Sequence, residues 1–109
     1  MLIFKIVPQA EWNSAGPAYA GSAHDQIDGF LHFSTEAQLA ETLRRYYAGR
    51  DDLLLLAVPT EALDDGLKWE HSPSRGEDFP HLFAALPRSA VLWQRALTRG
   101  ADGEFLLPL

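Results

Sequence analysis

One apolar run constrains the fold more than any other part of this 109-residue chain. Every side chain from Leu53 to Val58 is apolar, and Pro59 follows directly. A strand covered on both faces has this pattern, whereas a strand with one solvated face alternates apolar and polar residues. Because proline cannot donate a hydrogen bond to a neighbouring strand, Pro59 marks the end of the run. The pattern therefore predicts the central strand of a sheet.

The rest of the chain favours further strands and one clear helix. The helix is expected to begin at Thr35, which pairs with Gln38 in a capping-box pattern, and to end before Gly49. The strands do not alternate with helices, which indicates an α+β fold. The length suits one small domain over residues 1–109, with a mixed or antiparallel sheet. These further strands are expected over residues 2–7, 30–34, 67–71, 91–97 and 104–107.

Two polar stretches are predicted to be loops. Residues 13–29 contain three glycines and a proline, and residues 72–78 contain a proline, a glycine and two serines. A loop as long as the first is uncommon in a small domain and is often functional. We hypothesise that both stretches close over a ligand, and the alternative is that they are mobile surface connections.

The composition excludes several classes of protein. There is no cysteine, which rules out a disulfide framework, a thiol nucleophile and a cysteine-based zinc site. The run Leu53–Val58 is far shorter than the roughly 20 residues of a membrane-spanning helix. The first residues lack the basic and apolar regions of a signal peptide. We therefore expect a cytoplasmic protein that does not contact a membrane.

The charge balance bears on partners. Fifteen acidic residues against nine basic ones give a net charge of -6, which works against non-specific binding to nucleic acid or anionic lipid. A local anion site would have to come from a few placed arginines. The candidates are Arg44, Arg45, Arg50, Arg75 and Arg88.

The predicted strand over residues 30–34 carries the first candidate site. Alternate side chains share a face, so Leu31 and Phe33 are expected in the core, and Phe30, His32 and Ser34 on the opposite face. An imidazole and a hydroxyl would then lie beside the start of the following helix, where anions are favoured. They could bind a phosphate, a ribose hydroxyl or a carboxylate. The alternative is a structural histidine and a serine that helps to cap the helix.

A second candidate site brackets the polar stretch over residues 72–78. Trp69, Glu70 and His71 precede it, and Phe79 and His81 follow it. Aromatic side chains with a carboxylate and imidazoles suit a small cleft for a planar or sugar-bearing ligand. Glu70 would act as a general base or bind ribose hydroxyls. The alternative places Trp69 and Phe79 in the core and Glu70 on the surface.

The sequence contains no recognised metal-binding or phosphate-binding motif. The four histidines could assemble with Asp25 or Glu70, but none has a known metal-ligand spacing, so no metal site is predicted. Gly-x-Gly-x-x-Gly, Gly-x-x-x-x-Gly-Lys and Gly-x-Ser-x-Gly are also missing.

Several of these residues together carry a family resemblance. They are an early Phe-Lys-Ile, a Trp soon after it, Asp-Gly-Phe-Leu-His-Phe-Ser-Thr over residues 28–35, the Trp69-Glu70 pair, and Phe-Pro-His-Leu-Phe over residues 79–83. In this combination the chain resembles the small bacterial family catalogued as domain of unknown function 952. The resemblance extends over nearly the whole chain.

The resemblance implies a fold similar to the ADP-ribosyltransferase domain, an ADP-ribosylation-like fold. This is a small α+β structure with one main helix and a bent, split sheet around a cleft, which holds NAD in active relatives. A nucleotide-like or small anionic ligand is then expected, with NAD as the candidate cofactor. His32 and Glu70 are the candidate catalytic residues, and the candidate ligand-binding residues are Ser34, Trp69, Phe79 and His81.

Other functions stay open at this point. The Leu-His-Phe-Ser stretch is also similar to a strand of the RNA 2′-phosphotransferases, which share the fold. The usual transferase motifs, such as His-Gly-Thr and a late Glu-x-Glu, are not plainly present. The alternatives are an active NAD-dependent transferase or RNA 2′-phosphotransferase-like enzyme, and a non-catalytic structural or protein-interaction domain. The sequence gives no indication of the oligomeric state.

Overall fold

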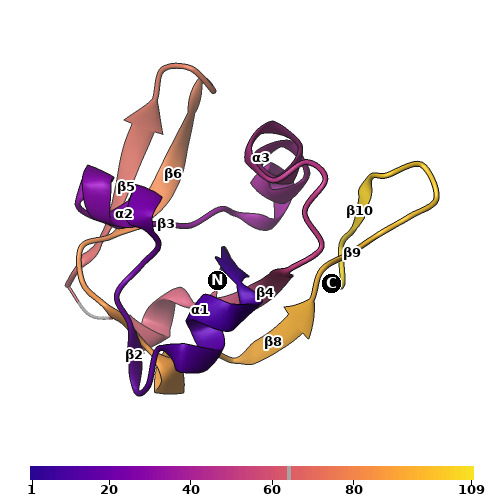
Figure 1. Cartoon of the computed structure of the whole chain (residues 1–109). Coiled ribbons are helices and arrows are strands. Elements are labelled where there is room, and N and C mark those ends of the chain that lie inside the picture. Colours follow the sequence, from indigo (N-terminus) through magenta and orange to yellow (C-terminus); the bar gives the residue numbers. More distant parts are fainter. Residues whose placement is uncertain (64) are drawn as a thin grey trace.

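The computed structural model describes residues 1–63 and 65–109, which form an α+β domain of antiparallel sheets and short helices (Figure 1). The helices are α1 (Gln9–Ser14), α2 (Ala23–Asp28) and α3 (Leu39–Tyr46), with 3-10 turns η1 (Glu36–Gln38), η2 (Thr60–Ala62) and η3 (Arg88–Ala90). The strands are β1 (Leu2–Pro8), β2 (Ala18–Tyr19), β3 (Leu31–His32), β4 (Leu53–Pro59), β5 (Leu67–Ser72), β6 (Glu77–Leu82), β7 (Leu86–Pro87), β8 (Trp93–Ala96), β9 (Thr98–Arg99) and β10 (Phe105–Leu106).

The apolar run is the central strand of its sheet, as predicted. β4 lies between β1 and β8 and pairs with both in antiparallel orientation. All six side chains from Leu53 to Val58 are buried. Leu54, Leu56 and Val58 pack into one apolar cluster, and the alternate residues of β4 pack into a second one. The run is continuously apolar because both of its faces are covered.

The amphipathic helix α3 covers one of these faces. Leu39 and Leu43 of α3 are buried in the same cluster as Leu53 and Leu55 of β4. The predicted capping box is confirmed. The Thr35 side chain accepts a hydrogen bond from the backbone N–H of Gln38, and the Gln38 side chain accepts one from the backbone N–H of Thr35. The chain makes one 3-10 turn before it continues as α3.

A second antiparallel sheet, in the order β3-β6-β5, carries most of the predicted site residues. His32 of β3 lies opposite His81 of β6. The two three-stranded sheets are connected by a bridge between Phe4 and Ser34, with reciprocal backbone hydrogen bonds of 2.8 and 2.9 Å. This bridge brings the candidate strand against β1.

The two predicted loops are shorter than expected. The loop prediction over residues 13–29 is wrong in part, because this stretch contains β2 and α2. Six-residue α2 buries one side chain, Asp25, and so leaves no apolar periodicity to detect. Its capping box, formed by Ser22 and Asp25, was present in the sequence as a Ser-x-x-Asp pattern. Over residues 72–78, β5 extends to Ser72 and β6 begins at Glu77, which leaves a tight hairpin turn.

Among the described residues, no helix combines the length and the apolar character that crossing a membrane requires.

Truncation of a fully buried leucine on β4 should destabilise the protein strongly. Leu55 is 0% exposed, so Leu55→Ala is expected to lower the free energy of unfolding by about 2–5 kcal/mol in urea denaturation. Leu92→Ala is the matched control, because Leu92 is 61% exposed and should change stability by less than about 0.5 kcal/mol. Equal losses in the two variants would contradict the central position of β4.

Candidate functional site

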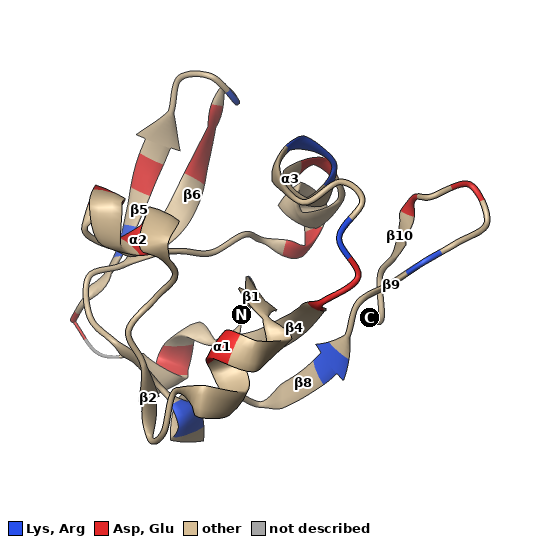
Figure 2. Ribbon diagram, in the orientation of Figure 1, with Lys and Arg blue, Asp and Glu red and all other residues tan. Residues whose placement is uncertain are grey.

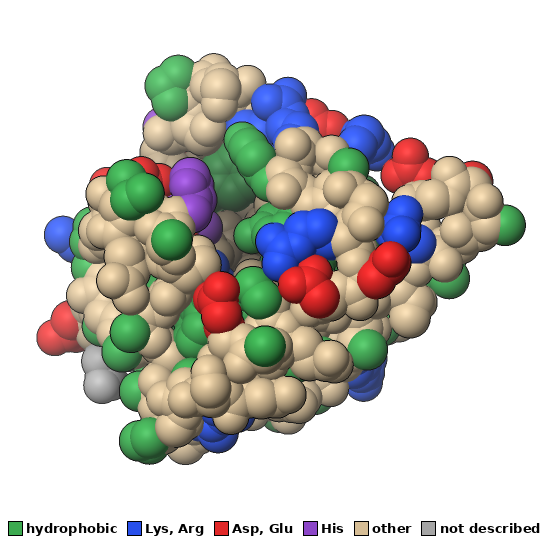
Figure 3. Space-filling model, in the orientation of Figure 1, with side chains coloured by type: hydrophobic (Ala, Val, Ile, Leu, Met, Phe, Trp, Pro, Cys, Tyr) green, Lys and Arg blue, Asp and Glu red, His purple; other side chains and the backbone are tan. Residues whose placement is uncertain are grey.

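A cavity of about 700 Å³ lies between the β3-β6-β5 sheet, α2 and α3. Figure 3 shows the hollow on this face, with a histidine at its rim and hydrophobic side chains inside it. The lining includes all four histidines of the chain. Its aromatic side chains are Phe4, Phe30, Phe33, Tyr46, Tyr47 and Phe79. The histidines, far apart in the sequence, are thus gathered at one place by the fold.

A buried ion pair fixes one wall of this pocket. Lys5 and Asp25 have side chains only 3% and 2% exposed, and the Lys5 Nζ lies 2.9 Å from Asp25 Oδ2. The backbone N–H of Ser22 donates to the same oxygen at 2.9 Å. Two charges removed from water are tolerated when they are paired and hydrogen-bonded, as they are here.

The other oxygen of Asp25 orients His32. The His32 Nδ1 lies 2.6 Å from Asp25 Oδ1, and the His32 backbone N–H donates to that oxygen at 3.1 Å. An ionised carboxylate can only accept, so Nδ1 carries the proton and donates. The Nε2 of the same ring points to Asp28 Oδ2 at 2.8 Å. The imidazole is held in one orientation before any ligand arrives.

The Lys5–Asp25 pair also affects the protonation state of the two side chains. Burial alone would raise the pKa of Asp25, but the hydrogen bond from His32 and the charge and hydrogen bond of Lys5 outweigh it, so the pKa lies well below its usual value. Burial lowers the pKa of Lys5, opposed by the charge of Asp25 and its hydrogen bond. Asp25 is therefore ionised throughout the neutral range and acts as a permanent acceptor for His32.

Gly21 allows this wall to close tightly. Its φ of 105° is disfavoured for residues with a side chain. A Cβ at this position would lie 2.6 Å from Leu31 Cδ2 and 2.8 Å from Asp25 Cβ. Only glycine therefore lets the chain pass this close to Asp25 and the core.

At the other side of the pocket, Arg75 reaches over from the β5–β6 turn. In Figure 2 a blue segment lies at the tip of the β5–β6 hairpin, and Arg75 is the basic residue of that turn. Its Nη1 donates to Thr42 Oγ1 at 3.0 Å, and its guanidinium lies 4.6 Å from the centre of the Phe79 ring. The Ser34 hydroxyl is 3.2 Å from the same Thr42 oxygen. Within residues 1–63 and 65–109, no salt bridge includes Arg75, whereas Arg50 is paired with Asp52.

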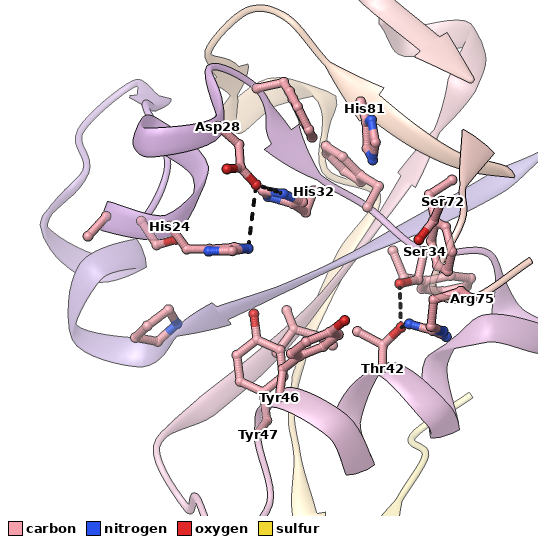
Figure 4. A pocket seen from close by; sticks show the side chains of 18 of the residues that line it. His24, Asp28, His32, Ser34, Thr42, Tyr46, Tyr47, Ser72, Arg75 and His81 are labelled. Atoms are coloured by element: carbon pink, nitrogen blue, oxygen red, sulfur yellow. Dashed lines mark hydrogen bonds and ion pairs between the residues drawn. The ribbon is translucent and has the colours of Figure 1, made fainter. Parts of the chain in front are cut away.

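Stacked rings connect the histidines. Phe30 stacks on His81 with ring centres 4.0 Å apart, and it contacts His32 at 4.6 Å. The His81 Nδ1 lies 2.8 Å from Glu70 Oε1. His24 stacks on His32, with ring centres 4.6 Å apart. Figure 4 shows His24 and His32 together at one end of the pocket, and Ser34, Thr42 and Arg75 at the other.

Four of the six predicted site residues line the pocket and two do not. The four are His32, Ser34, Phe79 and His81. Glu70 lies outside the lining and reaches it only through its contact with His81. Trp69 is 43% exposed and also lies outside. Neighbours on a strand point to opposite faces, so Trp69, opposite Pro80, is turned away from the face that carries Glu70 and His81.

Sequence reasoning missed the residues contributed by α2 and β1. No site role was assigned to Lys5, Asp25 or Asp28 in the binding prediction, although a lysine inside the apolar β1 run was a signal of a buried partner. No metal site was predicted, yet donor atoms of His24, Asp28 and His32 all lie within 4.8 Å of one another. The spacing was not recognisable because two of these side chains lie on a helix and the third on the strand that follows it.

Fold and site together define a small α+β domain with a histidine-lined pocket. The chain belongs to the family described as protein of unknown function (DUF952), whose model matches residues 6–94. It is similar to the crystal structure of protein CC0527 from Caulobacter crescentus, with 42% identity, a TM-score of 0.91, and coverage of 98% of this chain and 95% of that chain. For the solution NMR structure of CC0527 the values are 43%, 0.83, 94% and 90%. No protein with a curated description matches the chain.

The Lys5–Asp25 ion pair should make the free energy of unfolding depend on pH. The variant Asp25→Asn should lack this contribution to the pH dependence. The pKa of Asp25 is lower in the folded state than the value of about 3.9 expected in the unfolded state. Its stabilising contribution is therefore complete above about pH 5 and is lost progressively as the pH falls below that value. Asp25→Asn leaves Lys5 without its partner and is expected to cost about 3–5 kcal/mol at pH 7.

Urea denaturation of both proteins between pH 7 and pH 2.5 tests this expectation. The difference in unfolding free energy should shrink towards the acid end. Asp102→Asn, in an exposed turn, is the matched control and should follow the wild type throughout. A difference that stays constant with pH would rule out the ionised pair.

Proposed function

We propose that the pocket binds a small nucleotide-like ligand that carries a planar ring and an anionic group. The observation that carries the proposal is the contrast between the two ends of one aromatic cavity. Arg75, free of carboxylate partners in the described part of the chain, lies at one end, and the oriented His32 lies at the other. Arg75 donates to the Gln38 carbonyl as well as to Thr42, and in a chain of net charge -6 a guanidinium inside a pocket suits an anionic ligand.

Size and lining support a small molecule. The volume of about 700 Å³ falls within the usual range for small-ligand pockets. Phe30, Tyr46 and Tyr47 offer ring faces for stacking a base or another planar group. The hydroxyls of Ser34 and Thr42 lie beside Arg75 and would bind the same anionic group.

We infer further that the fold is of the ADP-ribosyltransferase type and that the ligand is NAD or a fragment of it. Two small antiparallel sheets, connected at the Phe4–Ser34 bridge with the pocket beside it, support this inference. In this scheme Glu70 does not touch the ligand. It positions His81, whose Nδ1 it contacts.

The contacts of His32 favour an enzyme as the second candidate function. Lys5, Asp25 and His32 form a chain in which a buried carboxylate fixes the tautomer and orientation of an imidazole. This is how enzymes prepare a histidine for general acid or base catalysis. His32 Nε2 is the atom that would exchange a proton with a bound substrate.

Replacement of Arg75 should weaken ligand binding without unfolding the protein. NMR titration of labelled protein with NAD and with ADP-ribose is expected to shift residues 30–35 and 79–83 saturably. Arg75→Gln should weaken binding by about 10-fold to 100-fold, the value of a hydrogen bond to a charged group. Arg95→Gln is the control, because Arg95 stacks on Trp93 and donates to the carbonyl of Pro108, outside the pocket lining. Unshifted spectra at millimolar ligand would remove the NAD proposal.

Replacement of His32 separates an enzyme from a binding protein. His32→Ala should abolish nicotinamide release from NAD in the enzyme case, and the variant should keep its circular dichroism spectrum. In the binding case the wild type releases no nicotinamide, and the variant loses only affinity. If His32 is purely structural, the variant loses about 1–3 kcal/mol of stability and the protein shows no ligand effect.

A further inference from the structure

We propose that His24, Asp28 and His32 bind a divalent transition-metal ion, with zinc as the best match, at the rim of the pocket. Two imidazoles and one carboxylate are the donor set of many zinc and non-haem iron sites. This inference goes beyond the proposed binding of a nucleotide-like ligand and does not depend on it. It is an alternative to proton transfer at His32 Nε2, because a nitrogen bound to zinc cannot carry the proton.

The three donor atoms lie close enough together to bind one ion. His32 Nε2 lies 2.8 Å and His24 Nε2 lies 3.6 Å from Asp28 Oδ2. All three donor atoms lie within 4.8 Å of one another. Donors in a tetrahedral site with bonds near 2.0–2.1 Å are roughly 3.3 Å apart. Small side-chain rotations therefore suffice to place an ion between them.

Local structure explains why the donors converge. His24 and Asp28 are one turn apart on α2, so both project from the same side of the helix. Gly29, with a φ of 84°, ends α2 and turns the chain back into β3. His32 consequently returns to the same side, and its ring stacks on that of His24 at 4.6 Å. Figure 4 shows both imidazoles directed at the Asp28 carboxylate.

The second, independent observation is the buried support behind His32. Asp25 Oδ1 accepts the Nδ1 proton at 2.6 Å, and Lys5 holds Asp25 in turn. Metal-binding histidines usually donate their other ring N–H to a carboxylate or carbonyl, which fixes the tautomer that leaves one nitrogen free for the metal. Here that arrangement leaves Nε2 facing the other two donors, 2.8 Å from Asp28 Oδ2, and a bound metal ion would take the place of any proton on Nε2.

The local charge and the solvent exposure of the three side chains also suit a metal ion. In the part of the chain that the structure describes, the only ion pairs of Asp28 are with these two histidines, so no lysine or arginine occupies the place of a cation. The side chains of His24, Asp28 and His32 are 73%, 37% and 30% exposed, which lets an ion enter from solvent. All three also line the pocket. An ion with three protein ligands would keep a position open toward the cavity for water or an anionic ligand.

Zinc alone is sufficient to test the proposal. Isothermal titration of the metal-free chain with Zn²⁺ should give saturable binding of one ion per chain, and Co²⁺ should give the visible absorption spectrum of a tetrahedral nitrogen and oxygen site. His24→Ala and Asp28→Asn should each weaken Zn²⁺ binding by about tenfold or more. Both changes are at exposed positions, so circular dichroism should show an unchanged fold.

His71→Ala is the matched control, because His71 is an exposed histidine paired with Asp78 outside the cluster. Its affinity for Zn²⁺ should equal that of the wild type. Absence of saturable Zn²⁺ binding in the wild type would overturn the proposal. Equal weakening by His24→Ala and His71→Ala would also overturn it, since it would indicate binding to surface histidines in general. No nucleotide is present in this experiment, so its outcome is independent of the ligand proposal.

Discussion

The buried contact between Lys5 and Asp25 connects the parts of this molecule that carry the site. Lys5 belongs to β1 of the central sheet, and Asp25 belongs to α2, which otherwise buries no side chain. A lone charge in such surroundings is strongly unfavourable, so each residue requires the other. Together with the Ser22 cap and the His32 contacts, the pair determines where α2 lies and which way the His32 ring faces. The pocket wall thus follows from electrostatics more than from apolar packing.

Sequence patterns predicted the core of the fold well because apolar packing requires apolar residues at regular positions in the sequence. The continuous run of β4 and the capping box at Thr35 each correspond to one local physical requirement, and both are confirmed. The predicted α+β class is confirmed as well. Helix α2 was missed because it is held by one buried carboxylate, which leaves no periodic pattern. The resemblance to the DUF952 family is confirmed by the family model. The similarity of the fold to ADP-ribosyltransferases stays a proposal.

The candidate site was predictable to the extent that it lies on strands. Alternation placed Leu31 and Phe33 in the core, and both are buried. His32 and His81 were predicted separately, and their cross-strand pairing depends on a register that a single sequence does not reveal. Arg75 appeared only as one of five candidate arginines, because its approach to Thr42 requires the β5–β6 hairpin to lie over α3. Trp69 and Glu70, adjacent in sequence, could not share a face of β5.

The shortness of α2 has a consequence for motion. A helix of six residues whose one buried side chain is Asp25 contributes no residue to the two apolar clusters, so α2 is held to the domain mainly by polar contacts. A local opening of α2 would break the Lys5–Asp25 pair and the contacts of the Ser22 cap. His24 and Asp28 would move away with the helix, while His32 stays on its strand. Opening of this end of the pocket would leave Lys5 without its partner, so it is coupled to the same ion pair that stabilises the domain.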